Sequence, residues 1–136
     1  MKKLLSPKPI AFETFLGILR IIVGLLMAYH GWEVFDRATI ESYFQWDVIK
    51  SLWAPGFMVY LGKGLELITG IFFIFGFLTR ISAIFMAIDM LFICFVIAQG
   101  RFWYEDQHPF VFALIATVFI FSGPGKWSVD KKIFRN

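Results

Sequence analysis

Ionisable side chains lie inside three stretches of this sequence that are otherwise almost wholly apolar. Arg20 interrupts the stretch LGILRIIVGLLMAY, and Asp89 lies in the stretch ISAIFMAIDMLFICFVIA. Lys63 and Glu66 fall one helical turn apart within MVYLGKGLELITGIFFIF. A charged side chain at the centre of a bilayer costs at least about 2.5–3.5 kcal/mol, so such residues usually face the protein interior, form pairs and mark function. These four residues are therefore candidates for ligand binding or proton transfer.

A second group of polar residues lies near the predicted outer ends of the same stretches. His30 and Glu33 follow the first stretch, and Glu105, Asp106 and His108 follow the third. We expect His30 to exchange protons, because the unperturbed pKa of histidine is about 6.5. The group has neither an HExxH motif nor a cysteine ligand, so we predict no metal site there.

Counting along ideal helices predicts how these residues are ordered in depth. From the cytoplasmic side, Arg20 and Asp89 both lie about 12–15 Å along their helices, whereas Glu66 lies about 18 Å along. We therefore predict that Arg20 pairs with Asp89 and Glu66. The predicted polar string consists, from inside to outside, of Arg20, Asp89, Glu66, Lys63, His30 and Glu33. The alternative is that these ion pairs only hold the helices together and fix their register.

The composition indicates a membrane protein. Hydrophobic residues make up 59% and charged residues 17% of the 136 residues, whereas soluble domains average about 45–50% and 25%. The formal net charge of +3 reflects basic residues clustered near the two ends, which is typical of membrane topology and not of nucleic-acid binding. The sequence has a single cysteine, Cys94, which lies in an apolar run. Because dithiol exchange needs two thiols, it is excluded within the chain.

The hydrophobic segments predict one all-α domain over residues 1–136, an integral membrane four-helix bundle. Three of the segments are near the length of about 20 residues that a membrane helix needs, and the fourth is shorter. The predicted spans cover residues 10–30, 57–78, 81–99 and 108–123, and an outer loop covers residues 31–56. The two-residue link Thr79-Arg80 between the second and third spans requires an antiparallel hairpin. The aromatic outer loop is expected to be partly helical and to lie at the interface, either as a lid or as a plain anchor.

Basic residues are distributed unevenly about the predicted spans. Eight lie on the side of the termini and the short link: Lys2, Lys3, Lys8, Arg80, Lys126, Lys131, Lys132 and Arg135. Three lie in the opposite loops: Arg37, Lys50 and Arg101. The positive-inside rule therefore predicts that both termini are cytoplasmic.

Glycines mark one face of the first span. Gly17, Gly24 and Gly31 share this face with Arg20 at 100° per residue. Small residues at such positions let a neighbouring helix approach closely. We therefore expect a tight helix contact here, with Arg20 pointing into the bundle.

Three blocks of the sequence, LRIIVGLLMAYHGWEVF, GLELITGIFFIFGFLTRISAI and SGPGKWSVD, together resemble the DoxX family. LRIIVGLLMAYHGWEVF is similar to the first-helix signature, in which Leu-Arg precedes a glycine and then His-Gly. GLELITGIFFIFGFLTRISAI resembles the second-helix block, and SGPGKWSVD resembles the family ending Gly-Pro-Gly-basic-x-Ser-x-Asp. This chain has Glu33 where the family often has a basic residue. The family's motif residues fall on Arg20, Gly24, His30, Gly31, Glu66 and Arg80.

The resemblance implies a small four-helix protein of the bacterial inner (plasma) membrane with a link to redox chemistry. Relatives include the small subunit of a thiosulfate:quinone oxidoreductase and components of oxidant-resistance complexes. We therefore expect the membrane subunit of a quinone-linked redox or oxidant-resistance system with an intramembrane polar pocket. Arg20 and Glu66 would orient a quinone carbonyl or relay a proton. We assign no catalytic residue. We expect no cofactor within the chain, and a quinone is the expected ligand. Because the chain would then have no redox centre of its own, the electrons are expected to come from a partner.

Two other classes of function are weighed against this expectation. The main alternative is a non-catalytic membrane scaffold or small-solute binding protein whose buried ion pairs are structural. A proton-coupled transporter is disfavoured, because four helices without repeats or broken spans give little room for alternating access. The expected partners are the lipid bilayer, a soluble or membrane oxidoreductase subunit and further copies of the chain in a homo-oligomer, but not nucleic acid.

Overall fold

A computed structural model describes residues 6–104 and 107–134, and within them the protein is all-α without strands. Its helices are α1 (Phe12–Gly31), α2 (Arg37–Tyr43), α3 (Asp47–Lys50), α4 (Pro55–Phe75), α5 (Thr79–Phe92), α6 (Gln107–Ser122) and α7 (Val129–Ile133). A 3₁₀ turn, η1 (Trp32–Phe35), continues α1, and a π-helical turn, η2 (Ile93–Ile97), continues α5. The sequence-based expectations for Lys2, Lys3, Glu105, Asp106 and Arg135 fall outside the described residues.

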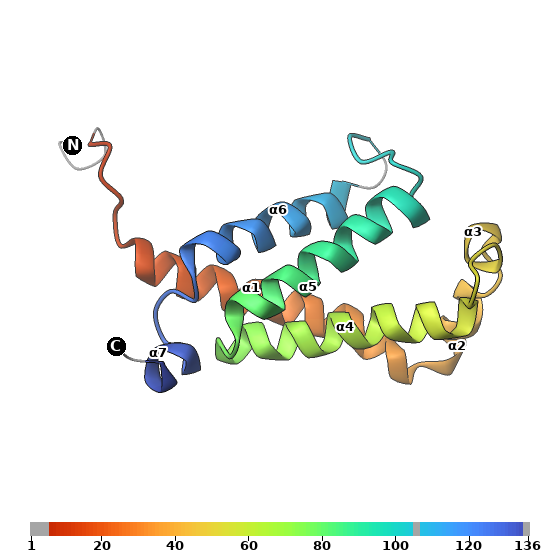
Figure 1. Ribbon diagram of the computed structural model, residues 1–136, viewed down its shortest axis with the longest axis horizontal. Coiled ribbons are helices and arrows are strands. Elements are labelled where there is room, and N and C mark those ends of the chain that lie inside the picture. Colours follow the sequence, from red (N-terminus) through yellow and green to blue (C-terminus); the bar gives the residue numbers. More distant parts are fainter. Residues whose placement is uncertain (1–5, 105–106, 135–136) are drawn as a thin grey trace.

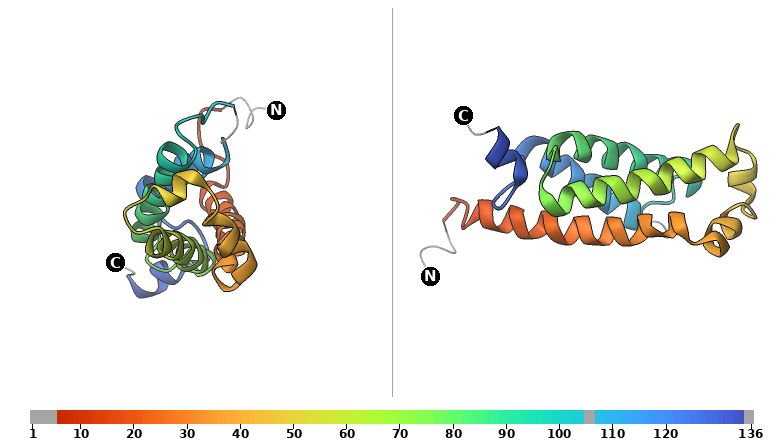
Figure 2. Two further views of the ribbon diagram at one scale, coloured as in Figure 1. Left: turned by 90° about the vertical axis from the view of Figure 1, so that its right-hand side faces the viewer. Right: turned by 90° about the horizontal axis from the view of Figure 1, so that it is seen from below.

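The four longest helices run alongside one another as two pairs (Figure 1). α1 packs most extensively on α4, and α5 packs on α6. The α5–α6 pair inclines away from the α1–α4 pair toward the end of the molecule where α2 and α3 lie (Figure 1). In the end-on view, α2 and α3 lie across that end, whereas α7 lies at the opposite end (Figure 2). We call residues 32–54 the cap segment.

Three helical stretches are long and apolar enough to cross a membrane, which makes this chain an all-α membrane protein. They are Phe12–Phe35, Pro55–Phe75 and Thr79–Ile97, of 24, 21 and 19 residues. Their outward faces carry exposed large apolar side chains, among them Phe15, Ile22, Ile68 and Ile88. α6 is apolar but has only 16 residues, about 24 Å at 1.5 Å per residue. That α6 crosses the bilayer as a fourth span stays a prediction.

Glycine allows α1 and α4 to approach closely, as the sequence predicted. A Cβ atom at Gly31 would lie 2.1 Å from the backbone nitrogen of Leu67, and one at Gly70 would lie 2.4 Å from that of Ala28. Any side chain larger than hydrogen would therefore push the two helices apart. This contact also places the end of α1 and the whole of η1 beside the middle of α4.

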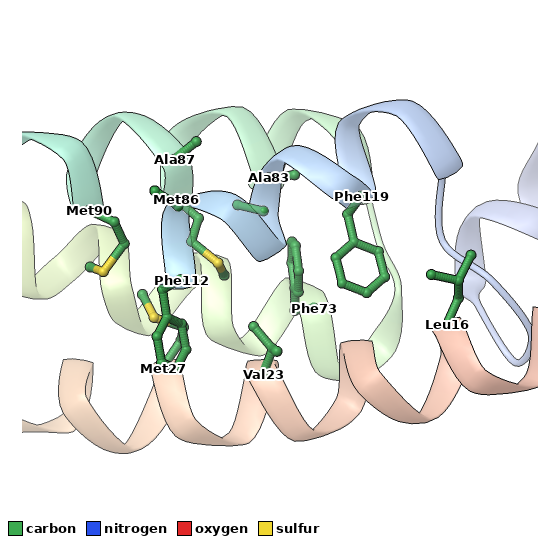
Figure 3. Packing of buried hydrophobic residues seen from close by; sticks show 12 residues of the cluster. Leu16, Val23, Met27, Phe73, Ala83, Met86, Ala87, Met90, Phe112 and Phe119 are labelled. Atoms are coloured by element: carbon green, nitrogen blue, oxygen red, sulfur yellow. The ribbon is translucent and has the colours of Figure 1, made fainter. Parts of the chain in front are cut away.

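The core lies between the two helix pairs and is filled by phenylalanine and methionine. Phe73 and Phe119 pack edge to face, with ring centroids 5.2 Å apart, a favoured aromatic geometry. Figure 3 shows Met27, Met86 and Met90 stacked along the same interior. A smaller apolar cluster joins the cap segment to the start of α4 through Ile40, Ile49 and Val59.

The link between α4 and α5 differs from the predicted Thr79-Arg80 link. α4 ends at Phe75, Gly76 adopts a left-handed conformation with φ of 65°, and α5 begins at Thr79. The Asp130 carboxylate accepts hydrogen bonds from the backbone nitrogens of Leu78 and Thr79, at 2.7 and 2.8 Å. A carboxylate at this position satisfies free N–H groups of the helix start. The helix therefore begins two residues earlier than its hydropathy suggests, and the hairpin itself is retained.

The cap segment is partly helical, as the sequence predicted. Asp36 caps α2 by accepting a hydrogen bond from the backbone nitrogen of Ala38. The hydroxyl of Thr39 donates to the other Asp36 oxygen, and these bonds lower the pKa of Asp36 below its usual value. Local hydrogen bonding thus explains why a helix forms in a segment with few periodic apolar residues.

Candidate functional site

Lys63 lies at the centre of a buried charged cluster. Its Nζ atom is 2.9 Å from Glu33 Oε2 and 3.0 Å from Glu66 Oε2. The side chains of Lys63 and Glu66 are only 15% and 5% exposed. The hydroxyl of Tyr43 donates to the same Glu33 oxygen at 2.6 Å, and the ammonium lies 5.3 Å from the centre of the Tyr43 ring. The Lys63 ammonium therefore contacts two carboxylates and the face of an aromatic ring in a site that is largely shielded from solvent.

Three elements supply the side chains of this cluster. Lys63 and Glu66 are one turn apart on α4, so they lie on the same face of the helix. Glu33 comes from η1, which the glycine contact of Gly31 holds beside α4. Tyr43 ends α2 in the cap segment, and burial followed by its bond to Glu33 raises its pKa above the usual value. Tyr43 therefore stays a neutral hydroxyl donor.

Asp89 lies beside this cluster and is 6% exposed. Its Oδ1 atom would be 3.5 Å from a Cβ atom at Gly62, so α5 approaches α4 closely at this level. Its Oδ2 atom is buried and has no hydrogen-bond partner in the part of the chain that the structure describes. A buried carboxylate oxygen without a donor is costly and calls for a partner that the described residues do not provide.

Two histidines lie on the side of the cluster next to α6. Nδ1 of His30 is 3.9 Å from Glu33 Oε1, and the rings of His30 and His108 are 5.3 Å apart. His108 lies in the first turn of α6 and also contacts the ring of Phe112 at a centroid distance of 4.7 Å. The two imidazoles therefore connect the start of α6 to Glu33 at the edge of the charged cluster.

A pocket of about 430 Å³ opens between the cap segment, α4 and α5. Its polar wall is made by side chains of the cluster, and the remaining walls are apolar. The polar lining consists of His30, Tyr43, Lys63, Glu66, Asp89 and His108. The apolar lining includes Met27, Trp46, Ile49, Leu52, Met58, Val59, Leu61, Leu65, Phe85, Ile88, Met90, Phe92, Ile93, Ile97 and Pro109. Such a pocket suits an amphiphile whose polar head is small compared with its apolar body.

The π-helical turn η2 contributes to the shape of the pocket. The backbone nitrogen of Ala98 donates to the carbonyl of Ile93 at 2.8 Å, a spacing of five residues. Ile93 and Ile97 at the two ends of this turn line the pocket. Single π-helical turns are frequent at functional sites, because they widen the helix locally.

The predicted pairing of Arg20 with Asp89 and Glu66 is wrong. Arg20 is fully buried, and its guanidinium donates to three backbone carbonyls. The acceptors are Phe73 at 2.8 Å, Pro124 at 2.6 Å and Trp127 at 3.0 Å. Asp89 lies beside residue 62 of α4, 11 positions from Phe73 and therefore about 16 Å along the helix. Arg20 holds the C-terminal segment and takes no part in the pocket.

The error has a geometric cause. The depth count assumed that the first and third spans start at the same level. In the structure, Arg20 lies at the level of the α4–α5 link, since a Cβ atom at Gly76 would be 2.2 Å from its Nη1 atom. The part of α1 that precedes Arg20 therefore extends beyond the hairpin, where it meets residues 124–127. A Cβ atom at Gly17 would be 2.7 Å from the carbonyl oxygen of Lys126, and one at Gly125 would be 2.6 Å from the nitrogen of Gly17. The family-like ending SGPGKWSVD therefore forms a clasp over the start of α1.

The structure brings together five of the six predicted site residues, namely His30, Glu33, Lys63, Glu66 and Asp89. Two further members were not among the predicted site residues. Tyr43 lies ten residues from its partner Glu33, in a segment without periodicity, so no sequence signal marks the contact. His108 was noted near the outer mouth, but nothing in the sequence placed it against His30. No group of three His, Cys, Asp or Glu side chains within the described residues is arranged to hold a metal ion.

The fold and the site define a class of protein: a small helical membrane protein with a charged pocket beneath a cap segment. Comparison with known proteins identifies the family. The DoxX family matches residues 15–99, which include all but the first three residues of α1 together with the cap segment, α4 and α5. This chain therefore belongs to the DoxX family.

A curated relative and the solved structures complete the comparison. The chain is 31% identical over 83 residues to a protein of Bacillus subtilis (strain 168) that bears the name "Putative oxidoreductase CatD". The match covers 60% of this chain and 58% of that relative, so the chain spans little more than half of its length. No solved structure matches this chain.

Proposed function

We propose that this protein is the membrane subunit of a quinone-linked redox system in the bacterial inner membrane and binds a quinone in the pocket beneath the cap segment. The observation that carries the proposal is the pocket itself: apolar walls end at a buried cluster of hydrogen-bonding groups around Lys63. A quinone has the matching form, with two carbonyl oxygens on a small ring and a long apolar tail. The name of the Bacillus subtilis relative supports a link to oxidoreduction.

The side chains of the pocket divide into donors and acceptors. Lys63 carries a third N–H donor that would orient a quinone oxygen, since only two are directed to Glu33 and Glu66, and Glu66 and Asp89 carry oxygens that accept hydrogen bonds or protons. His30 and Glu33, at the edge of the cluster, would exchange protons with the aqueous side. Reduction of a quinone consumes two electrons and two protons, and in this proposal an oxidoreductase partner supplies the electrons while these residues handle the protons.

The pocket has a route from the lipid phase. Phe85 and Ile88 of α5 line the pocket, and their side chains are 49% and 59% exposed. A ligand dissolved in the bilayer would reach the pocket between these side chains without crossing an aqueous phase. This arrangement suits a lipid-soluble substrate better than a small polar solute.

The proposal includes an orientation in the membrane. Both termini would be cytoplasmic, and the cap segment would lie on the outer side, in agreement with the excess of basic residues at the end of the molecule where α7 lies. Reporter fusions should then place Asn136 in the cytoplasm and an insertion at Ile40 outside. A reporter at Asn136 that is active on the outer side would overturn this orientation.

Quenching of tryptophan fluorescence tests the proposed ligand. Trp46 lines the pocket, so decylubiquinone or a menaquinone analogue should quench the protein in mild detergent in a saturable manner. The variant Trp46→Phe should lose most of this saturable quenching, whereas Trp127→Phe, at the opposite end of the molecule, should retain it. If saturable quenching is absent in the wild type, the protein does not bind quinones, and a structural scaffold is the better interpretation.

A further inference from the structure

Asp89 offers the pocket an acceptor that nothing in the described chain uses. The residue is 94% buried, since its exposed fraction is 6%, and it lines the pocket. Its Oδ2 atom lacks a hydrogen-bond donor among the described residues. Buried polar atoms in native proteins are nearly always satisfied, and an exception at a pocket wall points to a ligand that provides the missing partner.

The neighbouring cation is already engaged elsewhere. Lys63 directs its ammonium to Glu33 and Glu66, at 2.9 and 3.0 Å. No ion pair within the described residues reaches Asp89. In its ionised state the Asp89 carboxylate can accept hydrogen bonds but cannot donate them, so the group that completes the site is a hydrogen-bond donor brought by the ligand.

We propose that the pocket binds the reduced quinol in preference to the oxidised quinone, with a quinol hydroxyl donating a hydrogen bond to Asp89 Oδ2. This inference rests on the proposed function and specifies the form of the substrate. Both ring oxygens of a quinone are acceptors only, so a quinone leaves Asp89 unsatisfied. A quinol carries two O–H donors and can donate to Asp89 while an oxygen lone pair still accepts from the third N–H of Lys63.

The preference has a consequence for electron flow. Binding and reduction are thermodynamically linked. A site that binds the quinol more tightly than the quinone therefore makes the bound quinone easier to reduce. Asp89 would thus be a positioning and selectivity residue that draws electrons from the partner onto the bound quinone. Exchange with the membrane pool would then be limited by release of the quinol.

Anaerobic calorimetric titration of the detergent-purified protein with decylubiquinol and decylubiquinone tests the inference. A hydrogen bond to a charged acceptor corresponds to about a 10- to 100-fold difference in affinity, so the wild type should bind the quinol more tightly by at least about 10-fold. Asp89→Leu should abolish the preference. Asp89→Asn, whose amide can donate to a carbonyl, should shift the preference toward the quinone. Ser82→Ala, a buried polar change on the same helix outside the pocket, should leave it unchanged.

The outcomes separate this inference from the proposed function. Equal affinities in the wild type, or tighter binding of the quinone, would overturn the quinol preference while leaving quinone binding intact. Retention of the preference in Asp89→Leu would also overturn it, because the selecting group would lie elsewhere. Failure of the wild type to bind either form would refute the proposed function itself. The wild-type comparison needs no variant, so it decides the matter even if a substitution at Asp89 prevents folding.

Discussion

Arg20→Met should be among the most destabilising single substitutions in this protein. The change removes three donors whose acceptors are the carbonyls of Phe73, Pro124 and Trp127. A hydrogen bond to a charged group contributes about 1.5–3 kcal/mol, but the three share one side chain, and Met keeps much of the apolar volume. Carbonyls in the partly exposed clasp can also regain water. We therefore expect a loss of about 4 kcal/mol in the free energy of unfolding, near the upper limit for one substitution.

Two measurements report this effect. Unfolding in mild detergent gives the free energy, and limited trypsin digestion reports release of the clasp, which contains Lys126. Arg20→Met should lose stability and become cleavable there, because its anchor to α1 is gone. Arg80→Met is the matched control: Arg80 is exposed at the same end of the molecule, and its loss should change stability by no more than about 0.5 kcal/mol.

Double-mutant cycles show whether this reasoning is right. Asp130 interacts electrostatically with Arg20 and caps α5, so Arg20→Met and Asp130→Asn should couple. Arg20→Met and Asp89→Asn should instead add to within about 0.5 kcal/mol, because the sites are far apart. Strong coupling between Arg20 and Asp89, combined with a clasp that stays resistant to trypsin in Arg20→Met, would refute the assignment.

Three further predictions concern the site and its supports. Gly31→Ala should lower stability markedly, because its Cβ would lie 2.1 Å from α4, whereas Gly64→Ala, with open space around it, should keep or slightly raise the melting temperature. Lys63→Met should cost about 3–5 kcal/mol by leaving buried carboxylates unpaired, and adding Glu66→Gln should recover part of that loss; no recovery would mean that the charges do not interact. For Asp36, carboxyl NMR should give a pKa below the usual value, so its contribution to stability is present above the unfolded pKa and lost as the pH falls through the lower folded pKa; an ordinary pKa would contradict this.

Much of the fold was predictable from the sequence, because hydropathy and helical periodicity report lipid exposure directly. The inward face of the first span was correct: Gly17, Arg20, Gly24 and Gly31 are all buried. The antiparallel hairpin was also correct. Its boundary was not, since the start of α5 is fixed by Asp130, about 50 residues away in the sequence. Capping across such a distance leaves no periodic signal near the helix that it stabilises.

The candidate site was predictable only in part. Charges in apolar helices identified Lys63, Glu66 and Asp89, because burying a charge is costly wherever it occurs. Which charged residues pair depends on how far each helix extends beyond its neighbours. Because α1 extends beyond the α4–α5 hairpin, Arg20 lies outside the site. Tyr43 could not be assigned, because its position depends on how the cap segment folds over α4.

Photo-crosslinking of a quinone is the most direct test of the central claim that the pocket beneath the cap segment binds a quinone or quinol. A photoreactive decylubiquinone analogue would be added to the protein in native membranes, and the labelled peptides would be mapped by mass spectrometry. The account predicts labels within residues 58–66 and 85–97, competed away by unlabelled ubiquinol and weakened by Lys63→Met. Labelling confined to the outward faces of α1 and α6, without competition, would contradict it.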